Sequence, residues 1–257
     1  MVADGMGGAA AGEVASAMAT KTIYDHMANK WGADGENTPQ QFAYRLKEAV
    51  ELTNQRIHGY AKEHPEVRGM GTTTTAVGIL ADHMYLTQVG DSRAYLVRGG
   101  SAVQLTKDQS LMQRLVDAGE LTEEEAEKSE RRNIILQALG PDPRVRVDLT
   151  HQEARRGDII VMCSDGLSGQ VRKEEIAEVV TGHLRDLSAA CGKLIDMANE
   201  RGGPDNITVV VAHLSGEGLR EMAGDETVGH EVYPLLDTES TTEPVPVYKG
   251  APPKPQS

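Results

Sequence analysis

Residues 158–167 read DIIVMCSDGL, an apolar run that ends in an aspartate and a glycine. A short continuous apolar run bounded by turn residues is typical of a strand buried on both faces. An aspartate near the end of such a strand is held by rigid backbone, while its carboxylate reaches the loop region beyond. The stretch therefore predicts a buried strand that carries Asp165 at its end.

Two other aspartates occur in the same kind of context. Asp4 lies in VADGMGG (residues 2–8), and Asp205 lies in GGPDNITVVV (residues 202–211). Carboxylates and backbone carbonyls are the ligands that Mg²⁺ and Mn²⁺ prefer, and Mg²⁺ usually keeps several waters. Three acids at strand ends therefore indicate a divalent-metal centre. The alternative is that each acidic residue beside glycine only marks a turn, as it does in most proteins.

Helical and strand periodicities occupy separate blocks of the chain. Apolar residues recur every four positions over residues 11–28, and Thr38 followed by Pro39 starts a second helix. Short runs rich in β-branched and aromatic residues then predict strands. The expected strands span residues 73–80, 84–89, 93–97, 158–163 and 207–214, with a further helix over residues 187–198. Blocks of this kind favour an α+β fold of antiparallel sheets with helices outside.

A charged, weakly apolar segment of about residues 107–143 interrupts the strands. Thr122 and Glu125 form a capping box within it, which predicts a helical insertion. Residues 1–216 are expected to form the folded body. Residues 217–257 hold eight acidic residues, three basic residues and six prolines without sustained periodicity, so we expect a flexible acidic tail or linker.

The composition excludes several classes of partner. The chain of 257 residues has a formal charge of −13, which disfavours nucleic acid, because phosphate binding needs clustered lysines and arginines. No apolar run approaches the ~20 residues that a membrane span needs, and no signal segment follows Met1. Only two cysteines occur, so no disulfide framework is expected. We expect a cytoplasmic protein that binds neither membrane nor nucleic acid.

Six strings, in order along the body, carry a resemblance to a known family. They are Asp4-Gly5-Met6-Gly7-Gly8 with Gly12-Glu13, Gly71-Thr72-Thr73, Val89-Gly90-Asp91-Ser92-Arg93, Leu105-Thr106-Lys107-Asp108, Ser164-Asp165-Gly166-Leu167 and Gly203-Pro204-Asp205-Asn206-Ile207-Thr208. With these strings the chain resembles the PPM, or type 2C, metal-dependent serine/threonine protein phosphatases in their bacterial form. The resemblance implies an α/β/β/α sandwich, in which two antiparallel sheets pack face to face between helices.

The resemblance also assigns metal ligands. Asp4 matches the carboxylate that bridges both metal ions, and Gly5 matches a backbone-carbonyl ligand. Asp165 and Asp205 match ligands of one ion of the pair. Asp108 matches an acid that joins Asp165 in holding a third, weaker metal ion. The implied cofactors are two Mn²⁺ or Mg²⁺ ions, with a third held loosely.

Further positions match residues that support the site. Asp91 and Asn206 match residues that orient waters and carboxylates, and the insertion at residues 107–143 resembles the mobile flap beside the active site. The implied reaction is hydrolysis of phosphoserine and phosphothreonine in proteins. Two cations ~3.5–4 Å apart lower the pKa of a shared water and clamp the phosphoryl oxygens for in-line attack. Cys163 is expected in the core and not as a nucleophile.

The sequence departs from the family pattern at two places. Met6 stands where animal members carry a histidine proposed as general acid, so Asp91 or a metal-bound water is expected to serve. Family members also begin with two strands that carry a phosphate-binding arginine and an acidic pair. The segment before Asp4 is too short for them, so we expect a chain truncated at its N-terminus, with unpaired sheet edges.

These features leave more than one function open. The expected partners of an active phosphatase are phosphorylated proteins, including a cognate serine/threonine kinase and its substrates, and a monomer is expected. A phosphatase fold without the phosphate-binding arginine and part of the metal shell would instead be a weakly active or inactive regulatory module. A metal-dependent phosphodiesterase or nuclease is a third reading, which the negative charge disfavours.

Overall fold

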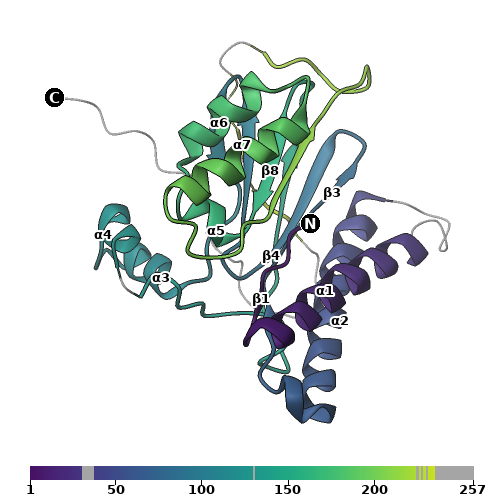
Figure 1. Cartoon of the computed structure of the whole chain (residues 1–257). Helices are drawn as coiled ribbons and strands as arrows, with labels where there is room; N and C mark the ends of the chain where they lie inside the picture. Colours follow the sequence, from purple (N-terminus) through teal and green to yellow (C-terminus); the bar gives the residue numbers. More distant parts are fainter. Residues whose placement is uncertain (31–37, 130, 224–225, 227, 230, 235–257) are drawn as a thin grey trace.

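The computed structural model describes residues 1–30, 38–129, 131–223, 226, 228–229 and 231–234. Two four-stranded antiparallel sheets pack face to face, and helices cover their outer faces (Figure 1). This architecture confirms the α/β/β/α sandwich that the sequence predicts.

The first sheet has the strand order β10-β7-β4-β3. These strands are β3 (Thr74–Leu80), β4 (His83–Val89), β7 (Asp148–Glu153) and β10 (Glu231–Val232). Helices α1 (Ala9–Lys30) and α2 (Pro39–Glu63) pack against each other, and α2 contacts β3 and β4. Phe42 of α2 meets Tyr85 of β4 edge to face, with ring centroids 5.3 Å apart. Thr38 caps α2 in a reciprocal box with Gln41, so the predicted helix start is confirmed.

The second sheet has the strand order β6-β5-β8-β9. These strands are β5 (Arg93–Arg98), β6 (Ser101–Gln104), β8 (Ile159–Cys163) and β9 (Val209–His213). Its outer face packs against α5 (Asp165–Ser168), α6 (Lys173–Gly182) and α7 (Leu187–Glu200). The continuous apolar run in β8 follows from its position between two layers: Ile160 and Met162 join the core between the sheets, while Val161 and Cys163 face the helices.

Short elements form a third, two-stranded sheet. The strands β1 (Gly5–Met6) and β2 (Gly71–Thr72) form a small antiparallel pair, and η1 (Pro65–Val67) precedes β2. The predicted insertion contains α3 (Leu111–Asp117) and α4 (Glu123–Glu127), which project from the sandwich (Figure 1). The capping box of Thr122 and Glu125 starts α4 as predicted.

The described part of residues 217–234, which we call the C-terminal segment, docks on the body. β10 pairs with β7, and the Tyr233 amide donates to the Leu149 carbonyl at 3.0 Å. Leu219 and Val228 pack against the core between the sheets. The prediction of a flexible tail from residue 217 onward is therefore wrong for this part, because local composition does not reveal contacts made with distant strands. Residues 235–257 lie outside the described residues.

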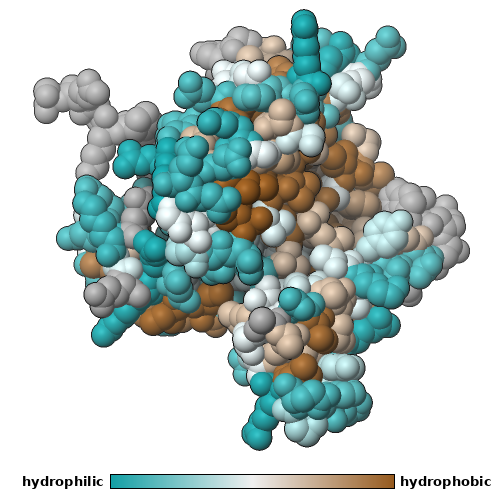
Figure 2. Space-filling view, viewed as in Figure 1, coloured by the Kyte–Doolittle hydropathy of each residue, from teal (hydrophilic) through white to brown (hydrophobic). Residues whose placement is uncertain are grey.

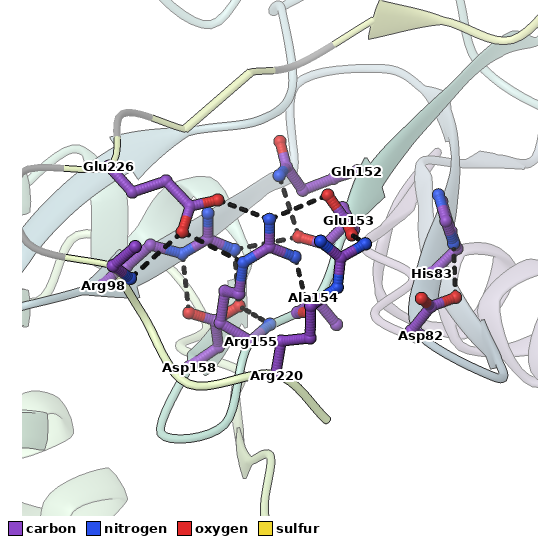
Figure 3. A network of polar contacts seen from close by, with 11 residues as sticks. Asp82, His83, Arg98, Gln152, Glu153, Ala154, Arg155, Asp158, Arg220 and Glu226 are labelled. Carbon is purple, nitrogen blue, oxygen red and sulfur yellow. Dashed lines mark hydrogen bonds and ion pairs between the residues drawn. The ribbon is translucent and has the colours of Figure 1, made fainter. Parts of the chain in front are cut away.

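Charged side chains attach the C-terminal segment to the turn between β7 and β8. Figure 3 shows the Arg155 guanidinium between the carboxylates of Glu153 and Glu226. Beside it, Arg98 donates to both oxygens of Asp158 at 2.7 and 2.8 Å, and both side chains are almost completely buried. The Arg155 amide also donates to Asp158 at 2.7 Å. Each buried charge of this network therefore has a partner, as burial requires.

Apolar side chains are exposed at an outer edge of the sheets. β3 is an outer strand of the first sheet and β9 is an outer strand of the second, and among the described residues β3 is extended beyond β4 only by the Val2–Thr75 bridge. Ile79 of β3 is 46% exposed. Figure 2 shows apolar side chains gathered between the two helical layers, over the region where β3 and β8 lie in Figure 1. None of the described helices is both long enough and apolar enough to span a bilayer.

The C-terminal segment is expected to contribute to the stability of the domain. A chain that ends at residue 216 loses the half-buried contacts of Leu219, Val228 and Tyr233. At about 1 kcal/mol for each half-buried side chain, the melting temperature should fall by roughly 6–12 °C. A chain that ends at residue 234 should melt like the complete one in differential scanning calorimetry.

A matched pair of substitutions separates the ion-pair network from the rest of the segment. Glu226→Gln leaves Arg155 without one carboxylate and should lower the melting temperature. Glu221→Gln removes the partner of the exposed Arg156 and should change it little. Equal effects of the two substitutions would contradict a stabilising role for the Arg155 contacts.

Candidate metal centre

Backbone hydrogen bonds fix Asp4 beside the first sheet. The Asp4 amide donates to the Thr73 hydroxyl at 3.0 Å, and its carbonyl accepts from the Thr73 amide at 2.8 Å and from the Thr72 hydroxyl at 2.9 Å. Gly5 lies opposite Thr72 in the β1–β2 pair. The main chain of Asp4 is thus held on both sides of its α-carbon, which limits where its carboxylate can point.

A close approach of two backbones explains the glycines after Asp4. A Cβ atom on Gly5 would lie 2.1 Å from the Gly12 carbonyl oxygen, and one on Gly12 would lie 2.7 Å from the Gly5 oxygen. Only glycine fits at these positions, so the first turn of α1 lies directly against the segment that follows Asp4.

A second close approach positions Asp165. This residue is the first of α5, directly after Ser164 at the end of β8. The Ser164 hydroxyl donates to the Asn206 carbonyl at 3.1 Å and accepts from the Thr208 amide at 3.0 Å. A Cβ atom on Gly166 would lie 2.3 Å from the Asn206 carbonyl oxygen. The loop that carries Asp165 is therefore pressed against the loop that carries Asn206.

Asp205 belongs to this second loop. Its side chain is exposed, and its Oδ1 accepts from the Asn206 amide at 2.8 Å. Its charge still raises the pKa of both Asp4 and Asp165, so the three carboxylates lie close enough for their charges to interact. The structure thus brings together the three aspartates that the sequence singled out from distant positions.

Asp4 and Asp165 form the centre of this cluster. Burial, followed by the charges of Asp165 and Asp205, raises the pKa of Asp4 to about 7. Burial and the charge of Asp205 also raise the pKa of Asp165. The Oδ1 atom of Asp165 is buried without a hydrogen-bond donor unless the two carboxyl groups share a proton. Such a buried, electron-rich oxygen is expected where a cation binds.

Asp91 lies in the tight turn between β4 and β5. Gly90 has a φ of 102°, a value that favours glycine, and the Ser92 hydroxyl is 2.6 Å from the Thr73 hydroxyl. Asp91 is buried, and burial together with the charges of Asp165 and Asp108 raises its pKa to about 7. Its carboxyl group is therefore able to hold a proton near neutral pH.

Asp108 has a partner already. The Arg93 Nε donates to its Oδ1 at 3.0 Å and the Arg93 Nη2 donates to its Oδ2 at 2.7 Å. Gln104 adds a longer hydrogen bond of 3.3 Å. The charge of Asp108 still raises the pKa of Asp91 and Asp165. Its role as ligand of a third metal ion stays a prediction, and such an ion would have to compete with the Arg93 guanidinium for these oxygens.

The donor set fits a hard divalent cation that keeps part of its water shell. Within the described ranges, no three carboxylate, imidazole or thiolate groups form a complete metal cage. Mg²⁺ and Mn²⁺ do not require one, because waters and a backbone carbonyl such as that of Gly5 complete their coordination. The carboxylates of Asp4, Asp165 and Asp205 would then provide only part of each coordination shell.

Cysteine chemistry is excluded on physical grounds. Cys163 is buried, and burial raises the pKa of its thiol to about 12. The thiol therefore stays protonated at neutral pH and cannot act as a nucleophile. The expectation that Cys163 belongs to the core is confirmed.

Several supporting residues were not assigned a role from the sequence. The threonines at 72 and 73 indicate strand propensity, but the structure shows that both position Asp4. Arg93 stands in the string with Asp91, yet only the structure pairs it with Asp108. No local signal was available for Thr72 and Thr73, because they lie 68 and 69 residues from Asp4 along the chain.

Comparison with known proteins identifies the family. Residues 1–201 match the family described as "Protein phosphatase 2C". This chain belongs to the protein phosphatase 2C family. Over 213 residues it is 40% identical to the serine/threonine protein phosphatase PstP of Mycobacterium tuberculosis (strain ATCC 25618 / H37Rv), covering 83% of this chain and 40% of PstP. Over 211 residues it is 36% identical to the serine/threonine phosphatase stp of Listeria monocytogenes serovar 1/2a, covering 82% of each.

Solved structures of the protein phosphatase 2C family have the same fold. The crystal structure of the M. tuberculosis phosphatase PstP/Ppp has a TM-score of 0.75 at 40% identity, covering 83% of this chain and 87% of that one. The catalytic domain of PstP in complex with two manganese ions has a TM-score of 0.72 at 39% identity, covering 83% and 86%. The family and fold predicted from the six strings are confirmed. The present chain spans about 40% of the length of the curated PstP.

The glycine contact between the two loops should be essential for metal binding. Gly166→Ala places a methyl group against the Asn206 carbonyl and should separate Asp165 from Asp205. We expect it to abolish the rise in melting temperature that Mn²⁺ causes. Gly59→Ala, within α2 and with open space around its Cβ, should preserve that rise and stabilise the helix by up to about 1 kcal/mol. A full Mn²⁺ shift in Gly166→Ala would contradict the proposed geometry.

Metal affinity should depend on pH. Burial and neighbouring acids raise the pKa of Asp4 to about 7, so without cations this ligand holds a proton that a cation must displace. Mn²⁺ affinity should therefore increase with pH up to about 7 and level off above it. Calorimetric titration in buffers of different ionisation enthalpy should detect proton release at pH 6 and little at pH 8.5.

The same shift predicts how the metal-free protein responds to pH. When folding raises the pKa of an acid, the contribution of that acid to folding stability is complete below its unfolded pKa, which is about 4 for aspartate. The contribution is lost as the pH rises through the folded pKa. The contribution of Asp4 and Asp91 is therefore lost as pH rises from about 4 to about 7. In the metal-free protein, Asp4→Asn should reduce this loss of stability. An affinity for Mn²⁺ that does not change with pH would contradict both expectations.

Proposed function

We propose that this chain hydrolyses phosphoserine and phosphothreonine in proteins at a centre that binds two Mn²⁺ or Mg²⁺ ions. The observation that carries the proposal is the pair of Asp4 and Asp165, whose carboxylates lie together in a partly buried site with one oxygen lacking a donor. Family membership supports the same reaction, because relatives are named serine/threonine phosphatases and one is described with two manganese ions.

Each residue of the centre would have a separate role in the reaction. Asp4, Asp165, Asp205 and the Gly5 carbonyl would hold the cations, and the two glycine contacts fix their loops. Bound divalent cations supply a Lewis acid that activates water and neutralises phosphoryl oxygens. Asp91, whose pKa is raised to about 7, would hold the proton that the leaving oxygen requires. Asn206 orients the loop of Asp205 through its backbone.

The proposed biological setting follows from the reaction. The substrates would be phosphorylated proteins, including a cognate serine/threonine kinase and the proteins that it phosphorylates. We also propose a monomer that works in the cytoplasm, in keeping with two unpaired cysteines and an acidic surface. A third cation would bind near Asp108 and Asp165, and Asp108 would have to leave Arg93 to hold it.

Hydrolysis of a phosphothreonine peptide tests the proposal. Activity should require Mn²⁺ or Mg²⁺ and disappear with chelator, while Zn²⁺ should support it poorly. Asp4→Asn and Asp165→Asn should each reduce kcat/KM by at least ~100-fold, since lost outer-shell support alone costs ~10–100-fold. Asp25→Asn, which removes an exposed carboxylate of α1, is the matched control and should leave kcat/KM unchanged.

The outcomes discriminate between the competing functions. Asp108→Ala should reduce turnover while preserving most of the Mn²⁺ shift in melting temperature. Chelator-insensitive hydrolysis would contradict a metal-dependent phosphatase. Mn²⁺ binding without hydrolysis of any phosphopeptide would instead indicate a regulatory module with the phosphatase fold.

A further inference from the structure

One basic segment borders the metal centre of this acidic chain. Residues 131–146 contain four arginines and a single acidic residue, Asp142, whereas the whole chain has a net charge of −13. We call residues 131–146 the arginine segment. It returns from α4 toward β1 (Figure 1) and is the second half of the insertion. Its charge is therefore opposite to that of the protein as a whole.

Hydrogen bonds join the first part of the arginine segment to the turn of Asp91. Ile135 forms a β-bridge with Ser110, and the Leu136 amide donates to the Gln109 carbonyl at 2.8 Å. Gln109 in turn exchanges two hydrogen bonds of 2.9 Å with Gly90, the neighbour of Asp91. The stretch around Gln109 therefore lies between this part of the arginine segment and the Asp91 turn, and it is hydrogen-bonded to both.

The second part is joined to the strand beside Asp4. Leu139 and Thr72 exchange two backbone hydrogen bonds of 2.8 and 3.0 Å, and Thr72 lies opposite Gly5 on its other side. Pro141 and the Met6 sulfur both lie 3.1 Å from where a Cβ atom of Gly71 would be. The arginine segment therefore runs along one edge of the carboxylate cluster.

Three arginines of the segment are available to a ligand. Arg131, Arg132 and Arg144 are exposed, and no carboxylate within the described ranges forms an ion pair with them. Arg146 differs, because its Nε lies 3.5 Å from Asp148 and its main chain exchanges two hydrogen bonds with Gln137. The Gln137–Arg146 contacts close the loop that carries Arg144, and the amides of Arg131 and Arg132 donate to the Ser129 hydroxyl and carbonyl, both at 3.2 Å.

We propose that Arg131, Arg132 and Arg144 bind acidic groups that flank the phosphorylated residue of a substrate. This inference rests on the proposed function and adds a substrate class to it, namely phosphopeptides with Asp or Glu close to the phosphorylated residue. An acidic peptide is repelled by a chain of net charge −13, so a local positive segment beside the site lowers that barrier. A guanidinium binds a carboxylate or a phosphate through paired hydrogen bonds. A second phosphorylated residue would therefore bind by the same chemistry.

The test compares phosphothreonine peptides that differ only in their flanks. The four flanks carry Glu, Gln, Lys or a second phosphothreonine, and kcat/KM is measured for each with Mn²⁺. The ratio of the Glu peptide to the Gln peptide should be about 3 to 10, because each exposed ion pair changes affinity by a factor of ~1.5–5. The ratio should fall toward 1 at ~0.5 M salt, where exposed charges are screened.

Two variants of equal charge locate the effect. Arg131→Gln with Arg132→Gln should bring the Glu/Gln ratio close to 1, and adding Arg144→Gln should complete the loss. Arg185→Gln with Lys193→Gln removes two exposed positive charges near α7 and should preserve the wild-type ratio. Because both peptides are measured with the same protein, a change in overall activity does not affect the ratio.

The results separate this inference from the proposed function. Hydrolysis of all peptides at equal kcat/KM would overturn the inference and leave the phosphatase activity intact. A ratio that falls equally in both variants would also overturn it, since total charge and not the arginine segment would then be responsible. If the enzyme preferred only the doubly phosphorylated peptide, the recognised group would be a second phosphate and not an acidic side chain. Hydrolysis of no peptide would contradict the proposed function itself.

Discussion

The repulsion between Asp4 and Asp165 is the constraint on which the rest of the site depends. Burial, together with the charges of neighbouring carboxylates, opposes the ionisation of both groups and raises their pKa values. The folded chain must supply the free energy that keeps them together when no cation is present. It does so with backbone contacts that leave the loops no other position: Gly5 against Gly12, and Gly166 against Asn206. A divalent cation then removes the repulsion that the fold has to oppose.

The sandwich provides these contacts because its two sheets end side by side. Asp4 is tied to the start of the first sheet through Thr73, and Asp165 follows β8 of the second sheet. The apolar core between the sheets, to which Leu86 and Ile160 contribute, sets how the two ends align. The site thus depends on long-range packing, and substitutions in that core can disturb the carboxylates without touching them.

Sequence patterns predicted most elements with strong local signals, although α6 was missed despite the apolar periodicity of Ile176, Val179 and Val180. The apolar run of β8, the Thr38-Pro39 start of α2 and the capping box of α4 were predicted from local rules and are present. β7 was missed because its sequence, DLTHQE, has one large apolar residue and is a strand only through pairing with β4. β10 was missed for the same reason. The metal-site aspartates could be found by their shared context, whereas the Arg93–Asp108 pair depends on a fold that brings two strings together.

The strand β2 has a further consequence, since it is shared by two different neighbours. Thr72 pairs with Gly5 on one side and with Leu139 on the other, so it is the middle of three aligned backbones. A displacement of Leu139 must either break its two hydrogen bonds to Thr72 or move Thr72, whose hydroxyl donates to the Asp4 carbonyl. Any ligand that shifts the insertion is therefore thermodynamically linked to cations at the carboxylates. Such linkage is reciprocal: if a peptide strengthens cation binding, cations strengthen peptide binding by the same factor.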